Sequence, residues 1–232
     1  MVLKTIELGL LEPPGGGGPL PFRTQLGTAR ADGPGDLGDC GLGPFSLQAG
    51  QVLVLAEVHD QANSTGGTTA AWAGNALVEQ AFGNWGSGSD FALSVWSLMV
   101  PGDATGSILL TLGNPVANSI LLIATAYRQV VSATIDLTKS FDGAGGIPDS
   151  GFSPPISQPD ELLVGYVGLE SATDPTGAWA DAMISGQKVF TTNVLLNLYE
   201  SYRTVNLIAP YRARKVDAVA VPWEARILAF RM

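Results

Sequence analysis

Short apolar runs separated by turn sequences recur along the chain from residue 47 to its end. In QVLVLAEVHD at 51–60, valine and alanine alternate with leucine, which is typical of a strand buried on at least one face. The run ELLVGYVGLE at 161–170 is apolar on both faces and predicts an interior strand. Further strands are predicted at 90–100, 107–115, 118–128, 130–137, 187–192, 215–221 and 223–231.

The turns between these runs indicate the fold class. Loops rich in small and polar residues occupy 63–69 and 140–160, and turns recur roughly every 8–15 residues without intervening helical patterns. This spacing predicts an all-β chain, an antiparallel β-sandwich of the jelly-roll type, and disfavours an α/β fold. Residues 194–205 fit either a strand or an amphipathic helix, and the sequence leaves both open.

A segment rich in glycine and proline precedes the apolar runs. Residues 2–10 alternate well enough for a short strand, and ten glycines and six prolines follow between Pro13 and Pro44. A chain of this composition has no internal hydrogen bonds to break, so it can lie extended along another chain. We therefore divide the protein into an N-terminal strand and Gly/Pro-rich arm at 1–46 and a β-sandwich domain at 47–232. The arm residues predicted to make contacts are Pro13, Pro14, Pro19, Pro21 and Phe22.

The charges are few and unevenly distributed. Charged residues make up 14% of the chain and the net charge is −9, but residues 203–232 contain six bases and only two acids. An acidic chain lacks the basic footprint that binds phosphates, so we expect no nucleic acid partner. The C-terminal bases predict a second contact surface that faces acidic neighbours. The bases of this surface are Arg203, Arg212, Arg214 and Lys215.

No residue or motif in the sequence indicates a catalytic site. His59 is the only histidine, and it ends a predicted strand, where we expect a loop-edge residue rather than the base of a Ser–His–Asp triad. Asp90, Glu161 and Glu170 lie at strand ends, but nothing selects two of them as a pair for glycoside hydrolysis. Phosphate-binding and dinucleotide-binding motifs are absent. We predict a protein that is not an enzyme, with no catalytic residue and no cofactor.

Three aspartates in a glycine-rich stretch are the one metal candidate. Asp32, Asp36 and Asp39 offer carboxylates of the kind that bind calcium, although a plain turn-rich loop is the favoured interpretation. Cys40 is the only cysteine, which excludes an intrachain disulfide. The N-terminal residues do not resemble a secretory signal, and the apolar run at 120–127 is too short for a bilayer, so we expect no membrane partner.

The tryptophans admit two interpretations. An exposed tryptophan can stack on a sugar ring, whereas aromatic residues of a sandwich usually belong to its core, which is the interpretation we favour. The five are Trp72, Trp85, Trp96, Trp179 and Trp223. Exposure of Trp72 or Trp179 would support an alternative function, a carbohydrate-binding or host-attachment module with a glycan ligand. A hydrolase on a jelly-roll scaffold is a third and less favoured hypothesis.

Four segments carry a resemblance to a known group of proteins. They are AGQVLVLAEV at 49–58, DFALSVWSLMV at 90–100, QPDELLVGYVGL at 158–169 and WEARILAFR at 223–231. In character and order they resemble the β-sandwich domains on the virions of tailed bacteriophages, of the capsid decoration, head-fibre and tail protein types. The resemblance covers residues 47–232, rests on packing residues and transfers no functional residue.

The resemblance implies a structural rather than a chemical role. A decoration or head-associated protein is made in the host cytoplasm and is localised to the virion. Its partners would be the major capsid protein, other virion proteins and further copies of itself in a homo-oligomer. We expect the arm at 1–46 to provide the docking contact.

Overall fold

The structure, a computed structural model, describes residues 22–60, 68–85, 91–113, 117–171, 177–191, 195–216 and 219–232, with the side chains of 34–36 excepted. In these residues the chain is all-β, and its paired strands run antiparallel. The predicted fold class is confirmed at the level of an antiparallel β-sandwich.

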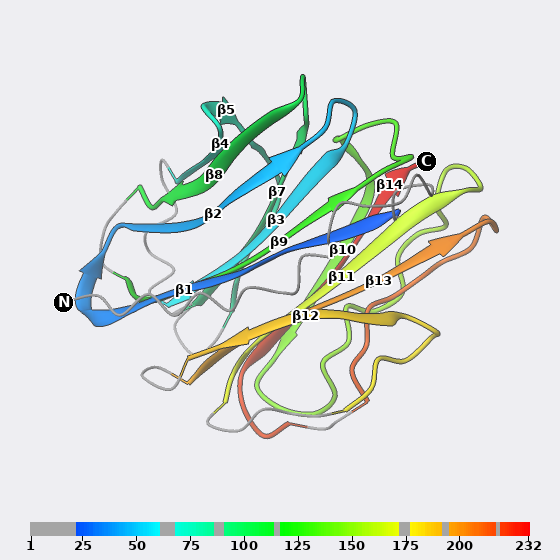
Figure 1. Ribbon diagram of the computed structural model, residues 1–232. Coiled ribbons are helices and arrows are strands. Elements are labelled where there is room, and N and C mark those ends of the chain that lie inside the picture. The colour runs from blue at the N-terminus through cyan, green and yellow to red at the C-terminus, as the bar shows by residue number, and fades with distance from the viewer. Residues whose placement is uncertain are drawn as a thin grey trace.

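The strands form three sheets, and one of them lies between the other two (Figure 1). The central sheet, sheet A, has the order β1 (Arg23–Leu37), β9 (Ala117–Tyr127), β3 (Val52–Asp60), β7 (Phe91–Met99) and β6 (Val78–Trp85). Sheet B contains β2 (Asp39–Leu47), β8 (Ala104–Thr111), β4 (Thr69–Trp72) and β5 (Asn75–Ala76). Sheet C contains β10 (Ile135–Gly143), β14 (Trp223–Arg231), β11 (Glu161–Glu170), β13 (Leu196–Val205) and β12 (Ile184–Phe190). Sheets A and B are therefore built from β1–β9, and sheet C is built from β10–β14.

Strand β3 shows why sheet A is central. Its residues Val54 and Val58 belong to a core that sheet A shares with sheet C. The residues Leu53 and Leu55 point to the opposite face and belong to a core shared with sheet B. Because both faces of the strand are covered, its sequence is apolar nearly throughout instead of alternating with polar residues.

The outer face of sheet C is covered by loops instead of a fourth sheet. We call the described parts of 144–160, 177–183 and 206–222 the outer loop layer. Their apolar side chains form a third core with the outer face of sheet C, and Ile156 and Ala213 are examples. At Gly165 of β11 a Cβ atom would lie 2.7 Å from the Cβ atom of Ala213, so the glycine lets this layer approach the sheet closely.

Several predicted strands are confirmed, and others are corrected. The strands β11 and β14 coincide with the predicted runs. Within the segment 194–205, which the sequence left open, Leu196–Val205 forms strand β13 rather than a helix. The predicted strand at 215–221 is wrong for its described residues: Lys215 and Val219 make only isolated bridges, and the side chains of Val219 and Val221 pack as a cover on sheet C. The predicted strand at 130–137 and loop at 140–160 are also displaced, since β10 spans Ile135–Gly143.

The glycine-rich segment after residue 21 belongs to the sheets. The strands β1 and β2 pair with β9 and β8 at the edges of sheets A and B, where glycine and proline are tolerated at irregularities in the ladder. One such irregularity lies between Leu42 and Phe45. The described sandwich therefore begins at Phe22, ahead of the predicted boundary at residue 47. The contact residues Pro13, Pro14, Pro19 and Pro21 lie outside the described residues.

Candidate functional site

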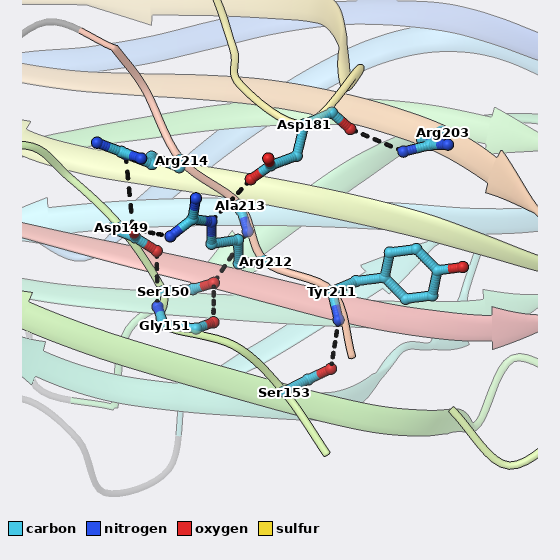
Figure 2. Close-up of polar contacts among 10 residues, drawn as sticks. All are labelled: Asp149, Ser150, Gly151, Ser153, Asp181, Arg203, Tyr211, Arg212, Ala213 and Arg214. Carbon is cyan, nitrogen blue, oxygen red and sulfur yellow. Dashed lines mark hydrogen bonds and ion pairs between the residues drawn. The ribbon is translucent and has the colours of Figure 1, made fainter. Parts of the chain in front are cut away.

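Three of the predicted C-terminal bases lie together (Figure 2): Arg212 and Arg214 are in the outer loop layer, and Arg203 is on β13. Arg212 donates hydrogen bonds to a carboxylate oxygen of Asp149 at 3.0 Å and to one of Asp181 at 2.7 Å. Arg214 forms an ion pair with Asp149 at 3.7 Å, and Arg203 donates to the carbonyl oxygen of Asp181 at 2.8 Å. These bases therefore join three loops of their own chain, and their predicted contact with another chain stays a prediction.

The acids hold Arg212 firmly in its charged form. The hydrogen bond to Asp181, followed by the charges of Asp149 and Asp181, raises the pKa of Arg212 above its ordinary value. The side chain of Arg212 is 20% exposed, so its ion pairs are partly shielded from water. Because the two acids neutralise most of the positive charge here, the three arginines mainly stabilise the outer loop layer.

Lys215, the fourth predicted base, is buried rather than on the surface. Its Nζ donates to the carbonyl oxygen of Gly177 at 2.8 Å and lies 4.5 Å from the ring centre of Tyr199 and 5.6 Å from that of Trp179. These groups line a cavity of about 180 Å³, together with Ser185, Gly186, Gln187, Lys188 and Glu200. The cation is thus held by aromatic faces and a carbonyl oxygen within its own chain.

Glu200 at this cavity belongs to a buried ion pair that joins sheets A and C. Its carboxylate accepts hydrogen bonds from Arg23, from Thr125 at 2.7 Å, from Tyr127 at 3.1 Å and from the backbone N–H of Gln187 at 3.0 Å. Burial lowers the pKa of Arg23, but the charges and hydrogen bonds of Glu200 and Tyr127 outweigh this and raise it. The carboxylate is therefore saturated with donors and has a structural role.

Large apolar side chains are exposed on two adjoining segments of the outer loop layer. Phe152 is 59% exposed, Leu207 is 68% exposed and Ile208 is 59% exposed. The segments are joined by the hydrogen bond from the backbone N–H of Ser153 to the carbonyl oxygen of Tyr211, at 2.8 Å. We call Phe152, Leu207 and Ile208 the apolar patch. Sequence reasoning missed it because both segments read as loops, and the only signal was prolines beside apolar residues.

The arginine cluster borders this apolar patch. The guanidinium carbon of Arg212 lies 4.4 Å from the ring centre of Phe152. The phenol of Tyr211 donates a hydrogen bond to the carbonyl oxygen of Leu207 at 2.7 Å. The patch is therefore held on a fixed support rather than on a free loop tip.

The arm residue Phe22 contacts its own sandwich. Its ring packs against that of Tyr127 with the centres 5.9 Å apart, and it adds to the core between sheets A and C. Its carbonyl oxygen accepts a hydrogen bond from the backbone N–H of Arg128 at 2.9 Å.

The histidine and the tryptophans are interior residues. His59 is buried in β3 and contacts Glu57, so the loop-edge interpretation is wrong. Burial lowers the pKa of His59, but the charge and hydrogen bond of Glu57 outweigh it and raise the pKa. The five tryptophans are at most 8% exposed, which confirms that they belong to the core and leaves no tryptophan face for sugar stacking.

The two calcium candidates whose side chains are described, Asp32 and Asp39, do not belong to a metal-binding group. Asp32 accepts hydrogen bonds from Ser119 at 2.7 Å and from Thr191 at 2.5 Å, so its carboxylate is already occupied. Asp39 is exposed on β2, and the side chain of Asp36 lies outside the described residues. Within the described part of the chain, no group of three or more histidine, cysteine, aspartate or glutamate side chains could hold a metal ion.

Glu161, for which the sequence indicated no second acid of a catalytic pair, has a carboxyl group close to it. Glu161 of β11 is fully buried, and its charge interacts with that of Asp136 on β10. The side chain of Asp136 is only 5% exposed. A pair of carboxyl groups as buried as this one cannot reach a substrate, so it is not the acid pair of a hydrolase.

Comparison with known proteins found no matching family model, no similar curated protein and no similar solved structure, so the site is interpreted from its own geometry. No helix that is long and apolar enough to cross a membrane occurs in the described residues.

Proposed function

We propose that this protein is a non-enzymatic structural component of a phage particle, a capsid decoration or head-associated protein that binds other virion proteins. The observation that supports a binding role is the apolar patch of Phe152, Leu207 and Ile208 on the outer loop layer. The assignment to a virion rests on the resemblance of residues 47–232 to virion surface domains. Residues 47–232 would then have the jelly-roll character of those domains.

The chemistry of the patch suits a protein partner. Protein interfaces have an apolar centre enriched in aromatic residues, with arginine common at the contact. Phe152 with the guanidinium of Arg212 above it offers this combination. Because Arg212 is already paired with Asp149 and Asp181, docking does not have to bury an unpaired charge.

The predicted arm supplies a second contact in this proposal. Phe22 is fixed at the edge of sheet A, so residues 1–21 would extend from that point. The strands β1 and β2 belong to the sandwich, so an arm can be removed without damage only up to residue 21.

Particle incorporation tests the patch directly. We expect the double variant Phe152→Ser/Leu207→Ser to fold normally and to lose at least about tenfold in affinity for particles, because two exposed contact residues are worth more than about 1 kcal/mol each when truncated. Leu109→Ser is the matched control, since Leu109 is 51% exposed on β8 of sheet B, at the other end of the stack. Occupancy of purified particles would be measured by quantitative gel analysis.

Deletion of residues 2–21 tests the arm separately. We expect the deleted protein to keep the melting temperature of the intact protein and to be lost from particles. If the patch variant and the deletion both fill particles to the level of the intact protein, the proposed function is wrong. All five tryptophans are buried, so none supports the carbohydrate-binding alternative, and we do not propose it.

A further inference from the structure

Four polar side chains meet at one end of sheet C, where β10 and β11 begin. Asp136 of β10 accepts hydrogen bonds from the backbone N–H and the hydroxyl of Ser157, at 3.0 and 2.7 Å. Arg231 of β14 donates to the same carboxylate at 2.6 Å through Nη2 and at 3.1 Å through Nε. Glu161, the first residue of β11, is opposite Arg231 in the ladder and fully buried. The loop before β11 is therefore tied to the edge strand through Asp136.

Glu161 lacks the donors that an ionised carboxylate needs. Neither of its carboxyl oxygens has a hydrogen-bond partner, and its other ladder neighbour is the apolar Val205 of β13. Burial of a charge without donors favours the neutral acid. This burial, together with the charge of Asp136, raises the pKa of Glu161 to about 7, and the opposing charge of Arg231 is too weak to prevent it.

Asp136 responds in the opposite direction. Its hydrogen bonds from Ser157 and Arg231 hold the pKa of Asp136 well below its usual range. When the surroundings of two neighbouring carboxyl groups separate their pKa values, the two groups together carry one proton at any pH between those values. Below about pH 7 this proton is on Glu161, and Asp136 is the ionised partner.

We propose that the proton on the buried Glu161 acts as a pH-dependent latch on the outer loop layer. Ser157 ties the loop to β10, and the neighbouring Ile156 is buried in the outer core. When Glu161 releases its proton to solvent water, two negative charges face each other beside a single guanidinium. The two carboxylates separate, the hydrogen bonds from Ser157 to Asp136 are lost, and the loop leaves the sheet.

The groups that surround Glu161 leave its protonation state to depend mainly on the pair of Glu161 and Asp136. The strand β10 contributes Asp136 and β14 contributes Arg231, whereas β13 contributes Val205. The loop contributes the backbone of Gln158, which favours the ionised form of Glu161 only weakly. Because the apolar patch residue Phe152 is on the same loop, the latch controls a surface that docking would use, although it does not depend on the proposed function.

Hydrogen exchange as a function of pH tests the latch. In the intact protein we expect the amide protection of Ile156 and Ser157, corrected for intrinsic exchange, to fall about tenfold between about pH 6 and pH 8, while β3 keeps its protection. In Glu161→Gln the side chain stays neutral, so the protection of the loop should not change with pH. His59 also titrates, but it is in β3 and remains in the variant, so it cannot account for the difference.

A second variant keeps the proposal falsifiable if Glu161→Gln does not fold. In Asp136→Asn the neighbouring charge is gone, so the carboxyl carbon signal of Glu161 in NMR should titrate at least about one pH unit lower than in the intact protein. The latch is overturned if this signal shows no titration between about pH 5.5 and pH 8.5 in the intact protein. It is equally overturned if Glu161→Gln loses loop protection with the same pH dependence.

Discussion

The buried ion pair of Arg23 and Glu200 gives the sharpest prediction for stability. The substitution Arg23→Met removes the guanidinium and keeps a side chain of similar length. It leaves Glu200 buried at the junction of sheets A and C, with donors remaining from Thr125, Tyr127 and Gln187. The guanidinium also lies 4.4 Å from the ring centre of Tyr202, and this contact is lost as well.

The expected cost follows from what remains around Glu200. Removing one partner of a buried pair costs about 3–5 kcal/mol in the free energy of unfolding. Three remaining donors keep the carboxylate partly satisfied, so we expect the lower end, about 3 kcal/mol, including the lost contact with Tyr202. For a chain of this length that corresponds to a decrease in melting temperature of about 6–12 °C.

Urea unfolding of four proteins separates the pair from its surroundings. They are the intact protein, Arg23→Met, Glu200→Gln and the double variant. The double variant should be more stable than the sum of the two single losses predicts, by about 1–3 kcal/mol. Arg203→Met is the control, because Arg203 of β13 makes an exposed hydrogen bond to the carbonyl oxygen of Asp181, and it should cost less than about 1 kcal/mol. A cost below about 1 kcal/mol for Arg23→Met, or full additivity of the single changes, would refute the reasoning.

Two further substitutions test the packing and the titration of the interior. Gly165→Ala should cost about 1–3 kcal/mol in urea unfolding, because the new Cβ atom would lie 2.6 Å from the hydroxyl of Ser201, whereas Gly102→Ala, which meets open space, should be nearly neutral. Equal stability of the two variants would contradict the close approach of the loop layer. The raised pKa of His59 stabilises the fold below the pKa of the unfolded chain, and this contribution is lost as pH rises through the folded pKa. The intact protein should therefore lose stability as pH rises above about 6.5, the ordinary pKa of histidine, and His59→Gln should lose less; parallel slopes would rule this out.

The apolar pattern of the sequence predicts which strands are interior but not what covers them. The sequence predicts β11 to be apolar on both faces and β3 to be buried on at least one face, and both strands are buried. The second face of β3 packs against another sheet, whereas the second face of β11 packs against loops. A buried position requires an apolar side chain whichever element covers it. The third sheet and the outer loop layer therefore could not be foreseen from the periodicity.

The edge strands and the polar site were hidden for a different reason. The strands β1 and β2 tolerate glycine and proline because each is paired on one side only, so composition alone suggested a detached arm. The bases of the loop layer are visible in the sequence, but their partner Asp149 is 63 residues from Arg212 along the chain. Glu161 looked like an ordinary acid at a strand end, since burial of a single side chain depends on residues that are distant in sequence.

The division of the sheets along the chain has a consequence for how the protein is made. Sheets A and B are complete once β9 ends at Tyr127, so the first half of the chain can close a two-layer core while the ribosome is still synthesising the second half. Sheet C begins at Ile135, and its inner face has no partner until it docks on sheet A. A break in the short connection between β9 and β10 would thus yield one fragment that folds alone and one that folds only on the first.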